Sequence, residues 1–288
     1  MADVIALIFD FDDTLVPDST TKLLEEHGID PQAFWNNDVK QFVTSGFDNT
    51  LAYLTLLLNN IGGSKPLGNL TQQDLRDFGA TLDQFLYPGL PALFRDLKKE
   101  VANFPEIQIE LYIISGGLQP IIEGTKVAKD HFTAVYGCKL ASDVDSGPLK
   151  YIQRSISFTE KTRYLFEINK GITPEEASRN PYSVNRSIPI EKRRVPFENM
   201  IYVGDGVTDV PCFSLMKNLG GMGFGVFDPG EKSSAKRALY DFLKTDRVIS
   251  MHAPRYRKSD ELGSFLRTAV VSRCAEITLR REQAQGRV

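Results

Sequence analysis

The sequence contains few of the residues that build disulfide frameworks and zinc clusters. Its 288 residues include 3 cysteines and 3 histidines. The cysteines, Cys138, Cys212 and Cys274, are odd in number and scattered, so they predict reduced thiols, with neither a disulfide framework nor a zinc site. The histidines lie far apart and lack metal-ligand spacing, so we expect structural or surface roles for them.

The sequence also lacks a strong excess of either charge and a long apolar run. Lys and Arg number 34 against 37 Asp and Glu, a formal net charge of −3, so nothing global draws the chain toward nucleic acid or an anionic membrane. No apolar run approaches the roughly 20 residues that cross a bilayer. The first strand pattern begins within a few residues of Met1, which leaves no room for a signal peptide. We therefore expect a cytoplasmic protein with no nucleic-acid or membrane partner.

Short apolar, β-branched runs alternate with helical patterns over most of the chain. The runs expected to be strands are residues 4–9, 107–114, 133–136, 200–203 and 223–227. Strands that alternate with helices indicate right-handed crossovers, and so an α/β fold with a parallel sheet. Residues 139–157 alternate around Asp145-Ser146-Gly147 and predict a β-hairpin.

Two parts of the chain show helical periodicity without strands. The first, between residues 17 and 87, predicts a small helical insert. The second, Ser259 to Glu282, predicts one helix with an apolar stripe, packed on the body or forming a homodimer. Residues 172–199 predict a long, partly irregular surface segment. The expected division is a core of residues 1–16 and 88–250, an insert of residues 17–87 and a C-terminal helical extension of residues 251–288.

Three carboxylates follow the first strand in the stretch Asp10-Phe11-Asp12-Asp13-Thr14. Acidic residues at the carboxyl end of a strand lie where open α/β sheets bind ligands. Because side chains alternate in an extended segment, Asp10 and Asp12 should point the same way and Asp13 the opposite way, in a structural role. Like charges on one face favour a bound cation; an acidic turn that caps the next helix is the alternative.

Three later stretches have similar chemistry: Ser115-Gly116-Gly117 after a strand, Lys161 near a helix start, and Asp205 with Asp209 after another strand. If they converge with Asp10 and Asp12 on one sheet edge, the aspartates supply the oxygen ligands that Mg²⁺ prefers. The Ser115 hydroxyl, the amides of the small turn and the Lys161 ammonium group together suit a phosphate. A carboxylate beside them can act as a nucleophile and form an aspartyl-phosphate.

These four stretches, in this order, resemble the signature motifs of the haloacid dehalogenase-like (HAD) hydrolase superfamily, over roughly residues 3 to 250. The insert resembles that family's α-helical cap of the C1 type, and the hairpin resembles the phosphoserine-phosphatase-like branch. The resemblance implies a three-layer Rossmann-like parallel-sheet core with an inserted small α-helical cap. Asp13-Thr14 and Thr208 depart from the phosphoserine phosphatase pattern, so the substrate stays open.

The resemblance also implies roles for the acidic residues. Asp10 would be the nucleophile, and Asp12 the general acid and then the general base. Mg²⁺ would be held by Asp10, the backbone carbonyl of Asp12, and Asp205, while Asp209 would support the metal or orient Lys161. An acid at position 12 argues against the dehalogenating branch of the family.

The phosphate would be bound by Ser115 and Lys161, with the N–H groups of Phe11 and Gly116. The implied function is a Mg²⁺-dependent phosphatase acting on a small phosphorylated metabolite. Two alternatives remain open, namely a phosphotransferase or phosphomutase of the same superfamily, and a non-catalytic phosphate-binding module. Phe34, Trp35 and Lys65 could face the substrate, but apolar residues at helical spacing are more often core, so we assign them no site role.

Overall fold

The centre of the molecule is a seven-stranded sheet with the strand order β4-β3-β2-β1-β5-β6-β7. The computed structural model describes residues 3–230 and 243–286, so residues 231–242 of the expected core and both chain ends lie outside the described residues. The strands are β1 (Asp3–Phe9), β2 (Ile107–Leu118), β3 (Ala134–Ala141), β4 (Tyr151–Arg154), β5 (Met200–Gly204), β6 (Met222–Val226) and β7 (Ser250–His252). Among the strands of the described residues, β3 and β4 alone pair antiparallel, which confirms the predicted α/β fold with a parallel sheet and its hairpin.

Strand β1 lies in the middle of the sheet because it is apolar on both faces. Its residues from Ile5 to Phe9 are fully buried, as expected for a parallel strand covered by helices on both sides. Phe9 is paired with Ile113 of β2 and with Val203 of β5. These three strands run in the same direction, so the residues that follow β1 and β5 meet the last residues of β2 at one edge of the sheet.

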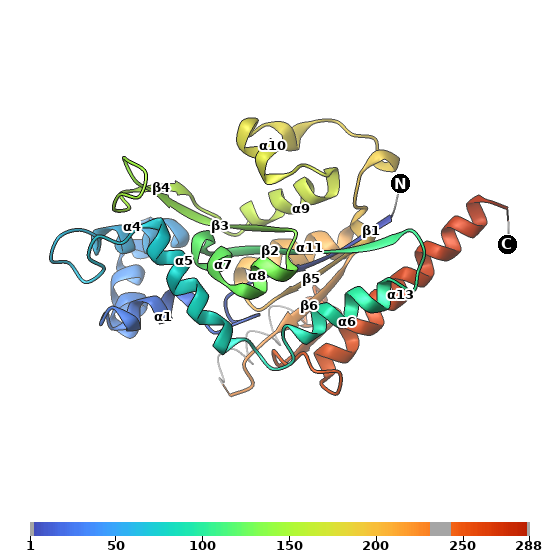
Figure 1. Ribbon diagram of the computed structural model, residues 1–288, viewed down its shortest axis with the longest axis horizontal. Coiled ribbons are helices and arrows are strands. Elements are labelled where there is room, and N and C mark those ends of the chain that lie inside the picture. Colours follow the sequence, from blue (N-terminus) through green and yellow to red (C-terminus); the bar gives the residue numbers. More distant parts are fainter. Residues whose placement is uncertain (1–2, 231–242, 287–288) are drawn as a thin grey trace.

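Helices cover both faces of the sheet, as Figure 1 shows. On one side lie α9 (Glu160–Lys170) and α10 (Pro174–Arg179), and on the other lie α6 (Ala92–Val101) and α13 (Glu261–Ala284). The remaining core helices and helical turns are α7 (Gln119–Gly124), α8 (Lys126–His131), α11 (Val210–Asn218), η3 (Ser183–Asn185), η4 (Ile190–Lys192), η5 (Phe197–Asn199) and η6 (Val207–Asp209). Helix α13 packs along α6, where Arg267 pairs with Asp96 at 2.8 Å.

Residues 17–87 contain helices and helical turns but no named strand, and they lie together beyond the carboxyl ends of the strands (Figure 1). The elements are α1 (Ser19–Glu26), α2 (Pro31–Ala33), the π-helix η1 (Phe34–Val39), α3 (Lys40–Thr44), α4 (Asn49–Asn59), α5 (Gln72–Thr81) and η2 (Leu82–Phe85). Side chains satisfy the helix starts: Asp48 caps α4, and Thr71 with Asp74 forms the expected capping box of α5. We refer to this segment as the insert.

The strands differ from the expected ones in two places. The run 133–136 and the first half of the hairpin form one strand, β3, because Gly137 continues the strand where the sequence suggested a break. A Cβ at Gly137 would lie 2.9 Å from backbone atoms of Gln119, so the glycine serves a close packing contact. The turn Ser115-Gly116-Gly117 lies within β2, where the register shifts between Ile114 and Leu118. Strand β7 and helix α10 were not predicted.

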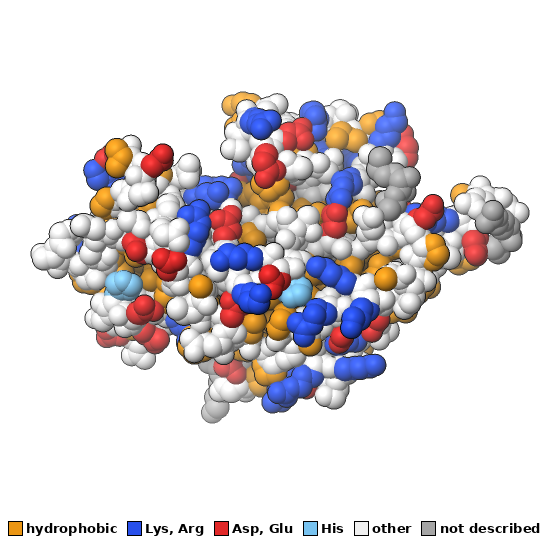
Figure 2. Space-filling model, in the orientation of Figure 1, with side chains coloured by type: hydrophobic (Ala, Val, Ile, Leu, Met, Phe, Trp, Pro, Cys, Tyr) orange, Lys and Arg blue, Asp and Glu red, His pale blue; other side chains and the backbone are white. Residues whose placement is uncertain are grey.

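The surface has mixed charge on the face drawn in Figure 2, where Lys and Arg side chains alternate with Asp and Glu. This mixture agrees with the small net charge of −3. Among residues 3–230 and 243–286, no helix combines the length and the apolar character that crossing a bilayer requires.

Two glycines bring the insert into direct backbone contact with the core. A Cβ on Gly79 of α5 would lie 2.0 Å from the carbonyl oxygen of Ile121 in α7. In the reverse direction, a Cβ on Gly124 would lie 2.1 Å from the carbonyl oxygen of Arg76. The two helices can approach this closely only because both positions lack a side chain.

We therefore expect Gly79→Ala to lower the free energy of unfolding by about 1–3 kcal/mol, because the added methyl group overlaps the α7 backbone. Urea denaturation of the full chain measures the change. Ala80→Leu is the matched control, because Ala80 is the next residue of α5 and is exposed; it should change stability by less than about 0.5 kcal/mol. Equal stability of Gly79→Ala and the control would contradict this packing account.

Candidate active site

A fully buried lysine joins two of the acidic stretches at the carboxyl edge of the sheet. Lys161, in the first turn of α9, has 0 % of its surface exposed. Its Nζ donates to Oδ2 of Asp10 at 2.6 Å and to Oδ1 of Asp209 at 2.7 Å. The structure therefore brings together residues that the sequence placed on three separate elements.

Asp209 is held rigidly by further hydrogen bonds. Its Oδ1 also accepts the Tyr202 hydroxyl at 2.6 Å, and its Oδ2 accepts the Gly206 N–H at 2.9 Å. Gly204, the last residue of β5, leaves room for this carboxylate, since a Cβ there would lie 2.4 Å from Asp209 Oδ2. Both oxygens of Asp209 thus have protein partners, which suits a residue that orients Lys161.

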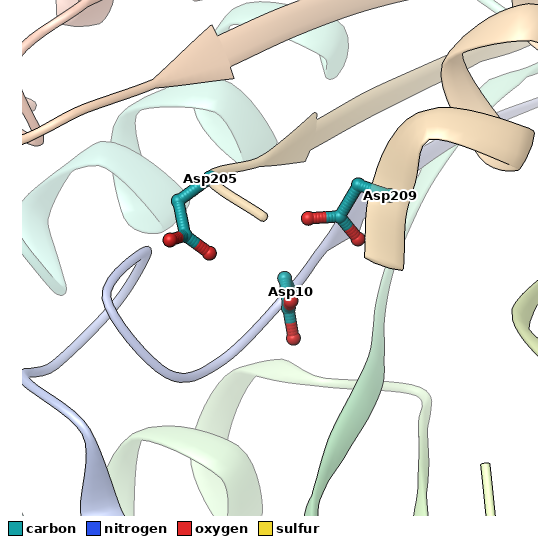
Figure 3. A group of neighbouring side chains, drawn as sticks. All are labelled: Asp10, Asp205 and Asp209. Atoms are coloured by element: carbon teal, nitrogen blue, oxygen red, sulfur yellow. The ribbon is translucent and has the colours of Figure 1, made fainter. Parts of the chain in front are cut away.

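The carboxylates of Asp10, Asp205 and Asp209 form one group, shown in Figure 3. Each offers an oxygen, and these oxygens lie within 4.8 Å of one another. Burial raises the pKa of Asp10 to about 6, against the opposing charge of Lys161. Burial also raises the pKa of Asp205 well above its usual range, and the Asp10 charge adds to the effect. The three carboxylates offer only oxygen ligands, and a bound cation would stabilise their negative charge. Such a group is chemically suited to Mg²⁺.

Asp12 lies beside this group but not in it. Its Oδ1 accepts the Ser19 N–H at 2.7 Å, and a Cβ on Gly117 would lie 2.4 Å from its Oδ2. Burial raises the pKa of Asp12 well above the ordinary value, and the nearby Asp18 charge raises it further. A raised pKa favours the protonated form of a carboxyl group, which is the form that a general acid needs.

The predicted phosphate-binding groups lie on β2 and after β1. Ser115 is buried, and its Oγ accepts the Gly117 N–H at 2.9 Å. The Gly116 carbonyl accepts the Tyr53 hydroxyl at 2.5 Å, so α4 of the insert is hydrogen-bonded to this turn. The Phe11 N–H donates to Asp10 Oδ1 at 2.7 Å and is therefore occupied by the carboxylate beside it.

A cavity of 840 Å³ lies between this edge of the sheet and the insert. The predicted residues that line it are Asp10, Asp12, Ser115, Gly116 and Asp205. Phe11, Lys161 and Asp209 are not part of its lining, and the latter two are fully buried. The cavity thus exposes the carboxylates and the serine, while the lysine supports them from behind.

The expectation that Asp13 points away from the site is wrong. Asp13 lines the same cavity. The alternation rule fails because the chain leaves the extended conformation after Phe11: the Leu15 N–H donates to the Phe11 carbonyl at 2.8 Å, and Asp13 has φ of +54°. In such a turn, consecutive side chains no longer lie on opposite sides.

Comparison with known proteins places this arrangement in a known fold. No family model matches the chain. A HAD family hydrolase from Salmonella enterica serovar Typhi has a similar structure, with a TM-score of 0.53 and 17% identity over 87% of this chain and 67% of that one. A probable phosphoserine phosphatase from Vibrio cholerae gives a TM-score of 0.55 and 14% identity over 96% and 67%. The chain therefore has the fold of these HAD-like hydrolase structures.

The chain also has a sequence relative. An uncharacterized protein of Borreliella burgdorferi is 31% identical over 242 residues, which cover 75% of this chain and 80% of that protein. The two proteins belong to one family. The similar solved structures confirm the predicted Rossmann-like core of the HAD type.

The sequence missed the part of the candidate site that the insert supplies. Trp35, Asn36 and Tyr53 line the cavity, whereas Phe34 is buried with 1% of its surface exposed and Lys65 does not line the cavity. Helical periodicity predicts Phe34 correctly as core. The polar Asn36 beside Trp35 was the one sign in the sequence that this part of the insert is not all core. Helical periodicity alone does not show that these two side chains line a cavity.

Removing the buried Lys161 ammonium group tests the electrostatics of the candidate site. We expect Lys161→Met to lower the free energy of unfolding at pH 7.5 by about 3–5 kcal/mol, because Asp10 and Asp209 lose their counter-charge. The loss should shrink toward pH 5. In the variant the folded-state pKa of Asp10 rises further above its unfolded value, so the folded state takes up protons and gains stability as the pH falls.

Chemical denaturation at several pH values in metal-free buffer measures both effects. Lys150→Met is the control, because Lys150 also pairs with an aspartate, Asp143, but on the surface. It should cost at most about 1 kcal/mol at every pH. A pH-independent loss for Lys161→Met would show that its role is packing and not charge.

Proposed function

We propose that the protein is a Mg²⁺-dependent phosphatase that hydrolyses a small phosphomonoester through an aspartyl-phosphate on Asp10. The observation that carries the proposal is the buried Lys161 ammonium group, paired with Asp10 beside a second carboxylate, Asp205, at the floor of a large cavity. A fixed cation, an oxygen-ligand group and an accessible carboxylate are the components that phosphoryl transfer needs. The HAD fold supports the same conclusion.

In this mechanism an oxygen of the Asp10 carboxylate attacks phosphorus, and the bond from phosphorus to the leaving alcohol breaks. Asp12, protonated because of its raised pKa, donates its proton to the departing oxygen. Asp12 then takes a proton from water as the water attacks the aspartyl-phosphate, which releases inorganic phosphate and restores both carboxyl groups. Lys161 holds Asp10 in position and offsets negative charge that develops there.

Mg²⁺, when bound by Asp10 and Asp205, would neutralise part of the charge on the transferring phosphoryl group. We also propose a cytoplasmic location. All three cysteines are free and buried in the described chain, and unpaired thiols are typical of a reducing compartment.

Hydrolysis of p-nitrophenyl phosphate tests the proposal. The full chain should release p-nitrophenol with Mg²⁺, lose this activity with EDTA and regain it when excess Mg²⁺ is added. Asp10→Asn should lower kcat by about 10³-fold or more, because an amide is a poor nucleophile. Asp38→Asn, on the exposed side of η1, is the control and should leave kcat unchanged.

Full activity of Asp10→Asn would rule out Asp10 as the nucleophile. Adding glycerol distinguishes hydrolysis from transfer: a phosphatase releases inorganic phosphate in proportion to p-nitrophenol, whereas a phosphotransferase forms glycerol phosphate in its place.

Proton competition should make Mg²⁺ affinity depend on pH. Because burial raises the pKa of Asp10 to about 6, Mg²⁺ must displace a proton from this group at lower pH. We expect the apparent Kd for Mg²⁺ to be nearly constant above pH 7 and to rise by up to about tenfold per pH unit below 6. Calorimetry in buffers of different ionisation enthalpy would count the protons released. An affinity that is constant from pH 5 to pH 7.5 would contradict the assignment of Asp10 as a ligand.

A further inference from the structure

Apart from Asp18, the insert side of the cavity is made of uncharged polar groups and aromatic rings. Its lining includes the hydroxyl of Thr20, the amides of Gln32, Asn36 and Asn49, and the rings of Trp35 and Tyr53. Among residues 3–230 and 243–286, no lysine or arginine lines the cavity. The alcohol part of a bound phosphate ester, which faces away from Asp10, would meet these groups.

The most informative of these groups is the Thr20 hydroxyl. Thr20 has 5% of its surface exposed and lines the cavity, yet its hydroxyl forms no hydrogen bond within the described chain. A hydroxyl at the wall of a cavity that has no protein partner is left to bind water or a ligand group. A hydroxyl both donates and accepts, and a ligand hydroxyl matches it in either direction.

The three amides extend the same chemistry across the mouth of the cavity. The side chains of Gln32, Asn36 and Asn49 are exposed and make no hydrogen bond to other described residues. Each amide offers two donors and one acceptor. Several neutral groups of this kind around one cavity suit a ligand with several hydroxyl groups, because each hydroxyl can pair with either end of an amide.

Two aromatic rings give the cavity an apolar wall. The centroids of Trp35 and Tyr53 lie 5.7 Å apart, with 52° between the ring planes. The Trp35 ring is held in place, since its Nε1 donates to Thr21 Oγ1 at 2.9 Å. Such rings bury C–H surface of a ligand, while the polar groups beside them bind its hydroxyls.

Charge excludes other kinds of alcohol. The carboxylates of Asp13 and Asp18 line the same cavity and would repel a carboxylate or a second phosphate on the substrate. An ammonium group would also suit aromatic rings beside a carboxylate. However, Asp18 already caps α1, where its Oδ1 accepts the Thr21 N–H at 2.5 Å, and an ammonium group would leave the amide donors unused.

We infer that the substrate is the phosphate monoester of an uncharged polyhydroxy alcohol, a sugar or a sugar alcohol. The inference rests on the proposed phosphatase function and specifies which esters the cavity selects. The phosphoryl group lies at Asp10, and the hydroxyl-bearing carbon chain lies against Thr20, the amides and the aromatic wall.

A matched set of esters tests the inference on the full chain with Mg²⁺. The set consists of sorbitol 6-phosphate and glucose 6-phosphate, O-phosphoserine and 3-phosphoglycerate, phosphocholine, and p-nitrophenyl phosphate as a reference. We expect kcat/KM for the better polyol ester to exceed that for each carboxylate ester and for phosphocholine by about tenfold or more, since unmatched charges in a polar site are costly.

Two variants connect this preference to the cavity. Thr20→Val and Asn36→Ala should each lower the ratio of kcat/KM for the polyol ester to that for p-nitrophenyl phosphate by about 3- to 10-fold, the effect of one neutral hydrogen bond. Asn37→Ala is the matched control. Asn37 is the next residue of η1, is exposed and does not line the cavity, so its ratio should stay unchanged.

The outcomes separate the inference from the function on which it rests. If p-nitrophenyl phosphate is hydrolysed but a carboxylate ester or phosphocholine is preferred, the polyol inference is wrong and the phosphatase assignment stands. The same holds if neither Thr20→Val nor Asn36→Ala changes the ratio. If no ester in the set is hydrolysed, including p-nitrophenyl phosphate, the proposed function itself is wrong.

Discussion

The site and the core share one interaction, the burial of the Lys161 ammonium group between two carboxylates. Asp10 is 151 residues away from Lys161 in sequence, and Asp209 is 48 residues away. A cation with no exposed surface is stable only when opposite charge and hydrogen bonds compensate for its lost hydration. Helix α9 must therefore lie where both strand ends can reach its first turn. The arrangement of the sheet and the arrangement of the site therefore depend on the same contacts.

The two sides of the cavity differ in the chemistry of the groups that line them. Charge is concentrated on the core side, where the position of each group is fixed by strands and by the Tyr202 and Gly206 hydrogen bonds to Asp209. Apart from Asp18, the insert contributes neutral groups to the cavity. Its position depends on the glycine contact between α5 and α7 and on the hydrogen bond from the Tyr53 hydroxyl to the Gly116 carbonyl. Changes in the insert can therefore alter what binds without disturbing the charged floor.

The sequence was most informative where one local pattern determines the structure. An uninterrupted apolar run made β1 a central strand, and strand ends in register brought Asp10, Ser115 and Asp205 to one edge. It failed where tertiary contacts override the local pattern. Gly137 suggested the end of a strand, but it continues β3 and allows a close contact with Gln119. Asp13 does not follow the alternation of side chains expected for a strand, because the chain turns there. The residues of the insert that line the cavity could not be predicted either, because periodicity shows which face of a helix is apolar but not which part of the structure that face contacts.

The carboxylates of Asp10, Asp205 and Asp209 differ in their hydrogen bonds, and these differences indicate which of them can bind a metal ion. Asp209 has partners on both oxygens, so using it as a metal ligand would cost its bond to Lys161, to Tyr202 or to Gly206. Asp10 also bonds to Lys161, but it lines the cavity, as Asp205 does. We infer that a cation would be bound by Asp10 and Asp205 from the cavity side, while Asp209 keeps Lys161 oriented. Lys161 contacts Asp10 from the buried side, and a cation held by Asp10 and Asp205 would stabilise the Asp10 carboxylate, the proposed nucleophile, from the cavity side.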